Sequence, residues 1–165
     1  MIRVRSARSE DVPRLLEIAA RSATTARWNE REYARLFEPS APTGLVVMVI
    51  EENDRVLGFL AGRELTRDGA EWEIENVAIS GPARRRGLGS RLLGEFLNLV
   101  RERGGRDIFL GVRASNHAAR RLYEKWAFEE VGVRKSYYQA PEEDALILRL
   151  SFPGEIRLNR SRPSC

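Results

Sequence analysis

Residues 72–125 carry the pattern that most restricts how this chain can fold. The strand pattern WEIENVAIS (72–80) leads through a loop into an amphipathic helix, which Gly104-Gly105 ends. A second strand pattern, DIFLGVRAS (107–115), leads into a helix that begins at Asn116. Strands that alternate with helices in this way form a sheet with helices packed against it.

Hairpin patterns flank this stretch on both sides. The overall order is β-α-α-β-β-β-α-β-α-β-β, which predicts one α/β or α+β domain over residues 1–152. The polar, basic residues 153–165 are expected to form a disordered tail. The other expected elements are a strand at 2–8, helices at 9–23 and 27–37, strands at 45–52 and 55–65 joined by Asn53-Asp54, and strands at 131–138 and 145–152.

The composition excludes several classes of protein. The longest apolar run, LVVMVI (45–50), is too short to cross a membrane, and the N-terminus lacks the apolar segment of a signal peptide. The single cysteine, Cys165, excludes an internal disulfide, and the single histidine, His117, disfavours a zinc centre or a histidine-based triad. We expect a cytoplasmic protein without metal or membrane. Its net charge of +4 fits an anionic ligand or a nucleic-acid neighbourhood.

Basic and glycine residues gather in ARRRGLGSRLL (83–93), directly before the first of these helices. Unpaired N–H groups converge at a helix N-terminus, the helix dipole adds partial positive charge, and glycine lets the backbone approach an anion. A solvated basic loop is the alternative, and the pattern R-x-x-G-x-G alone does not decide between them. The order of strand, loop and helix around it favours a bound phosphate.

These residues resemble the cofactor-binding signature Q/R-x-x-G-x-G/A of the GNAT superfamily of acetyl-CoA-dependent N-acetyltransferases, with Arg84, Gly87 and Gly89 in the matching places. The resemblance extends over most of residues 1–152 and is closest to the RimI-type enzymes, which acetylate the N-terminal alanine of a small-subunit ribosomal protein. The narrower match rests on ARWNEREY, VRASNHAARRLYEKWAF, SYY and EDALIL. It implies the GNAT fold, a central mixed, mostly antiparallel sheet with splayed parallel strands, flanked by helices.

The resemblance also implies acetyl-CoA as cosubstrate. Its pyrophosphate would be held by backbone N–H groups of residues 85–90, with arginine side chains at the rim, and its pantetheine arm would lie along strand 72–79. Asn116 would bind the cofactor where the parallel strands separate. The implied cofactor site comprises Val77, Ala78, Ile79, Arg84, Arg85, Arg86, Gly87, Leu88, Gly89, Ser90, Asn116 and Tyr123.

Acetyl transfer from a thioester to an amine needs a neutral amine, a stabilised oxyanion and a protonated leaving thiolate. The resemblance implies that Tyr123, about two helical turns after Asn116, donates the proton to the thiolate. The alternative is a core aromatic beside Leu122. The backbone N–H of Val77 has the position that the family uses for the oxyanion.

This chain differs from the family pattern at the position of the catalytic base. RimI-type enzymes usually carry a glutamate where this chain has Gly111, and glycine offers no proton acceptor. Glu73 and Glu75 share one face of their strand by two-residue alternation, and Glu73 matches the position used by histone-acetylating members. We expect Glu73 to act through water, with Glu75 as the second candidate; the alternative is two exposed charges.

The turn after the second helix also departs from the family. Trp126-Ala127-Phe128 replaces the usual x-G-F, so the turn either avoids a strictly left-handed conformation or adopts it with modest strain. His117 directly follows Asn116 and is expected to be a surface residue of the helix.

Four aromatic residues are predicted to wall a peptide groove, with ordinary half-buried aromatics as the alternative: Trp28, Tyr33, Tyr137 and Tyr138. The predicted function is acetylation of a protein N-terminal α-amine by direct attack in a ternary complex. The alternatives are a small-molecule amine or a lysine side chain as acceptor, or an acetyl-CoA-binding module with weakened catalysis. Direct nucleic-acid binding is not expected, because the arginines are scattered along the chain.

Overall fold

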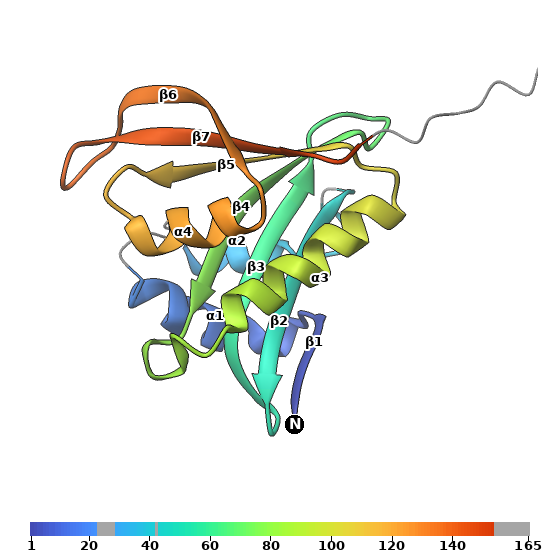
Figure 1. Cartoon of the computed structure of the whole chain (residues 1–165). Helices are drawn as coiled ribbons and strands as arrows, with labels where there is room; N and C mark the ends of the chain where they lie inside the picture. Colours follow the sequence, from blue (N-terminus) through green and yellow to red (C-terminus); the bar gives the residue numbers. More distant parts are fainter. Residues whose placement is uncertain (23–28, 42, 154–165) are drawn as a thin grey trace, which may run out of the picture.

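The computed structural model describes residues 1–22, 29–41 and 43–153, which form a seven-stranded sheet flanked by helices (Figure 1). The strand order is β1-β2-β3-β4-β5-β7-β6, and β4 and β5 are paired parallel whereas the other neighbours are antiparallel. The strands are β1 (Ile2–Ser6), β2 (Leu45–Glu52), β3 (Arg55–Glu64), β4 (Glu71–Ile79), β5 (Asp107–Arg113), β6 (Glu129–Tyr138) and β7 (Glu143–Ser151).

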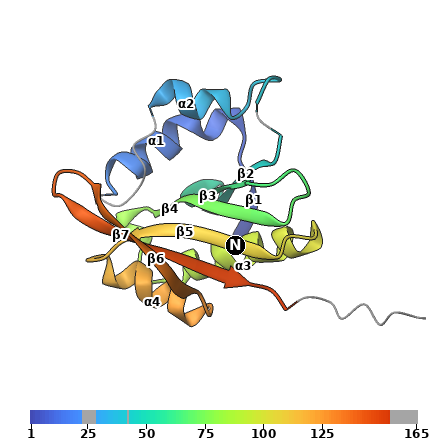
Figure 2. The same ribbon diagram turned by 90° about the horizontal axis from the view of Figure 1, so that it is seen from above.

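Helices cover both faces of the sheet. In Figure 2, α1 and α2 lie on one side and α3 and α4 on the other. Each side has its own apolar core: Phe96 of α3 packs with Trp72 of β4 on one side, and Tyr33 of α2 packs with Phe59 of β3 on the other. No helix in the described part of the chain is long and apolar enough to cross a membrane. The helices are α1 (Val12–Ala20), α2 (Glu30–Arg35), α3 (Leu88–Glu102) and α4 (His117–Lys125), with short 3-10 turns η1 (Ser9–Asp11) and η2 (Gly81–Ala83).

This arrangement confirms the predicted mixed, mostly antiparallel sheet with its flanking helices. The predicted boundaries differ at several ends: the first strand ends at Ser6, and the first helix begins at Val12 after a 3-10 turn. Residues 154–165 of the predicted tail (153–165) and Trp28 lie outside the described residues.

The pairing of β3 with β4 contains a β-bulge. Ile74 pairs with Gly62 and Asn76 pairs with Ala61, so Glu75 between them has no register partner. An inserted residue of this kind reverses the alternation of side chains along the strand. The two-residue alternation expected for the whole strand therefore holds only on each side of Glu75.

The parallel strands β4 and β5 separate beyond the bulge. Their pairing ends at Ile74 and Leu110, whereas β5 continues against β7 as far as Arg113. The second half of β4, from Glu75 to Ile79, consequently has no partner on β5. This separation is the splayed pair of strands that the family resemblance implied.

Helix α4 ends in a left-handed turn at Ala127, where φ is 66°. The N–H of Ala127 donates to the carbonyl of Glu124 at 2.9 Å, and that of Phe128 donates to the carbonyl of Tyr123 at 3.0 Å. These two bonds define a Schellman motif. The Phe128 ring then packs edge-on against Tyr123, with centroids 5.5 Å apart. Of the two alternatives for Ala127, the chain adopts the strained one, and the turn fixes the position of Tyr123.

Replacing Ala127 by glycine should therefore raise the free energy of unfolding. A left-handed alanine costs roughly 1–2 kcal/mol, and the greater freedom of glycine in the unfolded chain offsets about 0.5–1 kcal/mol, so we expect a net gain of about 0.5–1 kcal/mol. Urea unfolding of Ala127→Gly measures it. The matched control is Ala119→Gly inside α4, which should lower the stability. Equal losses in both variants would contradict the expected strain.

A buried ionic network connects β1, β2 and the start of α1. The guanidinium of Arg5 donates to both carboxylate oxygens of Asp11, at 2.8 and 3.0 Å, and its Nε donates to Glu51 at 2.9 Å. Arg3 also bonds to Glu51. Asp11 and Glu51 are 7% and 2% exposed. Neither carboxylate is open to water, so Asp11 depends on Arg5 for its stabilisation and Glu51 depends on Arg3 and Arg5.

The same contacts shift the acidity of both carboxyl groups. The hydrogen bonds from Arg5 hold the pKa of Asp11 below its ordinary value, although burial acts against them. Burial also acts to raise the pKa of Glu51, but the hydrogen bonds from Arg3 and Arg5 outweigh it and leave that pKa lowered. Both groups are therefore held ionised in the folded protein.

Candidate active site

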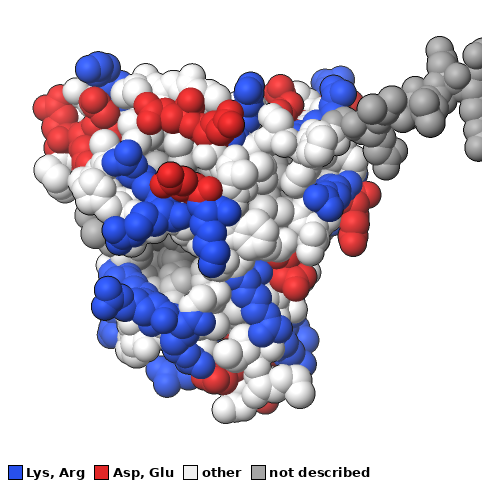
Figure 3. All heavy atoms as spheres, viewed as in Figure 1, with Lys and Arg blue, Asp and Glu red and all other residues white. Residues whose placement is uncertain are grey.

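A cavity of about 720 Å³ lies where β4 and β5 separate. This volume is within the range of roughly 300–1,000 Å³ typical of small-molecule sites. Figure 3 shows a hollow in the surface with lysine and arginine side chains on both sides of it, and Arg84, Arg85 and Lys125 belong to the lining of the cavity. The predicted site residues that line it are Glu75, Val77, Ala78, Ile79, Arg84, Arg85, Gly87, Leu88, Gly89, Ser90, Asn116 and Tyr123.

The start of α3 points its backbone N–H groups at this cavity. Gly87 is the N-cap residue with a left-handed φ of 74°, and the first N–H groups of any helix lack an intrahelical acceptor. Leu88, Gly89 and Ser90 occupy those positions and all line the cavity. The dipole of α3 adds partial positive charge there, so this end of the cavity suits an anion.

Gly89 leaves room that a side chain would fill. A Cβ atom at this position would lie 3.6 Å from Leu122 and 3.8 Å from Ile79, an ordinary contact distance on both sides. A longer side chain would therefore extend into the space between α3, α4 and β4. The absence of a side chain at Gly89 therefore keeps this part of the cavity open.

Arg86 departs from the prediction that it contacts the ligand. It pairs with Glu52 on β2, at 2.9 and 3.2 Å, and it is not among the residues that line the cavity. Arg84 lines the cavity, and its Nε donates to the carbonyl of Ile79 at 3.1 Å. The two arginines of this loop are thus held in different directions by partners outside the loop sequence.

Trp126 connects the end of α4 to the start of α3. Its indole Nε1–H donates to Oγ of Ser90 at 3.0 Å. The indole ring lies against Gly94, where a Cβ would be only 3.0 Å from Cη2 of the ring. Sequence reasoning considered Trp126 only as part of a turn and missed this bond, because the two partners are 36 positions apart.

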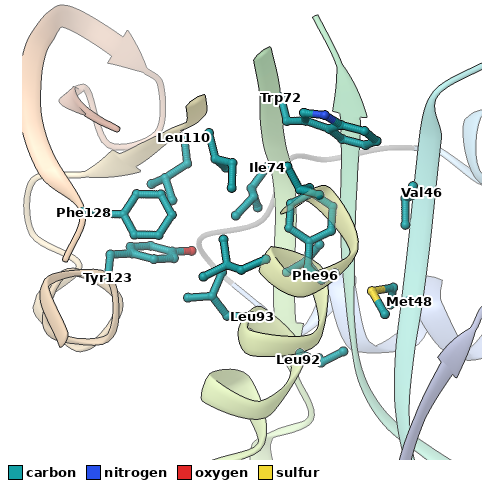
Figure 4. Close-up of a cluster of buried hydrophobic side chains, with 14 of the residues drawn as sticks. Val46, Met48, Trp72, Ile74, Leu92, Leu93, Phe96, Leu110, Tyr123 and Phe128 are labelled. Carbon is teal, nitrogen blue, oxygen red and sulfur yellow. The ribbon is translucent and has the colours of Figure 1, made fainter. Parts of the chain in front are cut away.

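Tyr123 places a protonated phenol at the wall of the cavity. The residue is 7% exposed, and its hydroxyl points from α4 toward the space between Ile74 and Leu93 (Figure 4). Burial, with a smaller contribution from the neighbouring Tyr138, raises the pKa of Tyr123 above its ordinary value. A phenol in this environment keeps its proton at neutral pH and is available as a proton donor.

Asn116 lies at the same wall and also begins α4. Its side-chain oxygen accepts a hydrogen bond from the N–H of Ala119 at 3.2 Å, as the N-cap of the helix. The oxygen is therefore used within the protein, and the amide NH₂ remains for a ligand. The adjacent His117 is exposed at the first position of α4, as expected.

The two candidate bases differ in position. Both pair with Arg63, Glu73 at 3.3 Å through Nη2 and Glu75 through Nε. The Glu75 side chain is 22% exposed against 36% for Glu73, and Glu75 lines the cavity whereas Glu73 does not. Burial raises the pKa of Glu75, Arg63 acts against this, and the charge of Glu73 adds to it. The geometry favours Glu75, the reverse of the order expected from the sequence.

Glu75 also belongs to a second cavity, of about 380 Å³, next to α2. The Glu75 residue therefore borders both cavities. The lining of the second cavity comprises Glu32, Arg35, Leu36, Thr43, Leu45, Arg63, Glu64 and Glu75.

The predicted aromatic groove is only partly available. Tyr33 is fully buried, its ring packs edge-on against Phe59, and its hydroxyl accepts from Nδ2 of Asn76 at 3.5 Å, so it offers a peptide no surface. Tyr137 is 55% exposed. Tyr138 is half-buried under the guanidinium of Arg113, 4.4 Å from its ring centroid.

Gly111 lines the main cavity, and the hydroxyl of Tyr138 would lie 3.8 Å from a Cβ built there. Among the described residues, no cluster of three or more histidine, cysteine, aspartate or glutamate side chains is arranged to hold a metal ion.

Comparison with known proteins gives a consistent result. Residues 12–128 match the model of the acetyltransferase (GNAT) family. The ribosomal protein bS18-alanine N-acetyltransferase of Escherichia coli K12 is 30% identical over 149 residues, 89% of this chain and 95% of the relative. A Bacillus subtilis protein that provisionally carries the same name is 36% identical over 146 residues, 88% of this chain and 92% of the relative. The crystal structure of the ribosomal-protein-S18-alanine N-acetyltransferase from Escherichia coli has a TM-score of 0.81 and 29% identity, covering 94% of this chain and 98% of that one.

Proposed function

Because the chain belongs to the GNAT family and is an acetyl-CoA-dependent N-acetyltransferase, we propose that it acetylates the N-terminal alanine of a small-subunit ribosomal protein. The observation that carries this proposal is the similarity along nearly the whole chain to two bacterial proteins named for that activity, at 30% and 36% identity. Such an acceptor is made in the cytoplasm, and we place the enzyme there.

The residues of the main cavity fit acetyl-CoA. The N–H groups at the start of α3, with Arg84 and Arg85 beside them, would hold the pyrophosphate. The unpaired half of β4, from Val77 to Ile79, would lie along the pantetheine arm, and Asn116 would donate to it through its amide. Acetyl-CoA supplies an acetyl thioester, from which the amine takes the acetyl group and the sulfur leaves as a thiolate.

Three groups of the protein would then serve the transfer. Glu75 accepts, through water, the proton that the acceptor ammonium loses before its nitrogen bonds to the acetyl carbon. The backbone N–H of Val77 donates a hydrogen bond to the carbonyl oxygen as negative charge develops on it. Tyr123 gives its hydroxyl proton to the sulfur when the carbon–sulfur bond breaks. The nitrogen loses a second proton as the amide forms, and this proton replaces, through water, the one that Tyr123 gave to the sulfur. The proton on Glu75 returns to solvent, so the enzyme is unchanged and one proton is released overall.

Replacement of Glu75 by glutamine should lower turnover most at low pH. An α-amino group has a pKa of about 7.7–8.0, so at about pH 6–7 most of the acceptor needs to lose a proton, whereas near pH 9 it is already neutral. We expect a loss of about tenfold near pH 6.5 that shrinks toward pH 9. A pH–rate profile with an alanine-starting peptide measures this.

The matched control for this profile is Glu73→Gln. It removes a carboxylate that lies on the same strand and pairs with the same arginine. It should have the smaller effect at every pH. If the Glu73 variant loses more turnover than the Glu75 variant, the sequence-based order of the two bases is right and the geometric order is wrong.

Valine at position 89 should weaken the binding of acetyl-CoA about tenfold or more, because its side chain would fill the cradle beside the pyrophosphate. Calorimetric titration with CoA gives the affinity, and a melting curve checks that the domain is folded. Gly132→Val on β6 is the control, since its nearest neighbour is 3.9 Å from a Cβ there and it does not line the cavity. Unchanged affinity in Gly89→Val would place the pyrophosphate elsewhere.

The acceptor is tested with three amines under identical conditions. These are an alanine-starting peptide that contains an internal lysine, the same peptide with a blocked N-terminus, and a polyamine, with mass spectrometry locating the added acetyl group. The proposal requires acetylation of the free N-terminus in preference to the other two. Preferred modification of the blocked peptide would indicate a lysine acetyltransferase, and preferred modification of the polyamine a small-molecule enzyme. Acetyl-CoA binding without any product would indicate a binding module.

A further inference from the structure

The hydrogen bond from Trp126 to Ser90 has no part in the transfer described above. Nε1 of Trp126 lies 3.0 Å from Oγ of Ser90. Ser90 is the third residue of α3 and lines the cavity, and Trp126 is the C-cap residue of α4, three residues after Tyr123. The bond therefore joins the anion-binding end of the cavity to the helix that carries the phenol.

The chemistry of the two side chains gives the bond a direction. An indole N–H can only donate, whereas a serine hydroxyl has one proton and two lone pairs. Ser90 is consequently the acceptor, and its own proton is left to be donated to another group. Accepting a hydrogen bond also polarises the O–H group and strengthens it as a donor. A phosphate oxygen is a strong acceptor for such a group.

Packing holds the indole in the orientation that this bond needs. The ring lies so close to Gly94 that a Cβ there would be 3.0 Å from Cη2 and 3.3 Å from Cζ2. The backbone N–H of Trp126 donates to the carbonyl of Tyr123 at 3.1 Å. The indole and the phenol are therefore fixed on one rigid helix end.

We propose that Trp126 is a positioning residue for the diphosphate of acetyl-CoA. It holds Oγ of Ser90 so that the hydroxyl proton is donated to a phosphate oxygen at the start of α3. The same contact sets the distance between this anchoring point and Tyr123. The inference rests on the placement of the cofactor given under the proposed function.

The test separates the effect of the hydrogen bond on CoA affinity from the effect of ring packing. Trp126→Phe keeps an aromatic ring against Gly94 but removes the N–H, and Ser90→Ala removes the hydroxyl. We expect each variant to weaken CoA binding about tenfold in calorimetry, as for loss of a hydrogen bond to a charged group. The double variant should be no weaker than either single one, because both remove the same contact. Ser90→Thr, which keeps a hydroxyl, should bind close to wild type.

A second acetyl donor shows whether the loss of affinity in these variants depends on the diphosphate. S-acetylpantetheine carries the same thioester without the diphosphate, so kcat/KM with it should be equal in the wild type and Trp126→Phe. Equal losses with both donors, or additive losses in the double variant, would overturn the inference and leave Trp126 a packing residue.

Two further outcomes separate this inference from the cofactor placement. Unchanged CoA affinity in Trp126→Phe alone would overturn the inference, whereas unchanged affinity in Gly89→Val as well would overturn the placement on which it rests.

Discussion

Replacing Tyr123 by phenylalanine should lower turnover by about 10²-fold or more while the affinity for acetyl-CoA stays nearly unchanged. The substitution removes one hydroxyl from a side chain that is 7% exposed, and the remaining ring still packs against Phe128. The raised pKa of Tyr123 means that the lost group is a protonated phenol. The thiolate would then have to leave without a proton donor at the cavity wall.

Steady-state kinetics with an alanine-starting peptide and calorimetry with CoA measure the two quantities separately. The matched control is Tyr33→Phe, which also removes a buried hydroxyl but from a residue outside the cavity. That variant should lose some stability and little turnover. Wild-type kcat in Tyr123→Phe would assign the proton to solvent or to another group.

Removing the cation of the buried network should strongly destabilise the fold. Arg5→Met would remove the guanidinium that bonds to both Asp11 and Glu51, which are 7% and 2% exposed, and would leave Glu51 bonded to Arg3. Loss of one partner from a buried ion pair costs roughly 3–5 kcal/mol. Urea unfolding should show a decrease of about this size in the free energy of unfolding.

Arg3→Met is the control, because Arg3 bonds to the same carboxylate from a side chain that is 56% exposed. Exposed ion pairs contribute about 0–1 kcal/mol, so its loss should be small. Similar losses in both variants would mean that the network contributes no more than a surface pair.

The pH dependence of the network has a defined sign. The folded-state pKa values of Asp11 and Glu51 are both lowered, so the folded protein binds fewer protons than the unfolded chain. Their contribution is fully present above the unfolded pKa of about 4 and is lost as the pH falls below it through the folded values. The stability difference between wild type and Arg5→Met should therefore shrink on acidification from neutral pH. A difference that stays constant down to about pH 3 would contradict this account.

The parts of the site that lie close together in the sequence could be predicted from it. Arg84, Gly87 and Gly89 form one turn of chain before an amphipathic helix, and the reason that they suit an anion is local to that turn. The pairing of Asn116 with Tyr123 follows from the pitch of a single helix. These inferences need no knowledge of what packs against the segment.

The parts that depend on distant partners could not be predicted. A bulge in β4 sets the direction of Glu75, and that bulge exists only in the pairing with β3. Glu52 draws Arg86 away from the cavity across 34 positions of sequence. The sequence predicts that Tyr33 walls a peptide groove, yet the packing of α2 over Phe59 buries this side chain. In each case the deciding contact is between strands or layers whose register the sequence does not display.

The position of Glu75 in the lining of both cavities has a consequence for how two substrates would reach the site. Glu75 lines both cavities, and the second cavity lies beside α2 whereas the first includes the starts of α3 and α4, so two ligands could approach this carboxylate from different directions. If acetyl-CoA fills the first cavity, as proposed, the second cavity would give the acceptor its own approach to Glu75. A long polypeptide could then present its first residue there while the rest of it stays outside the first cavity.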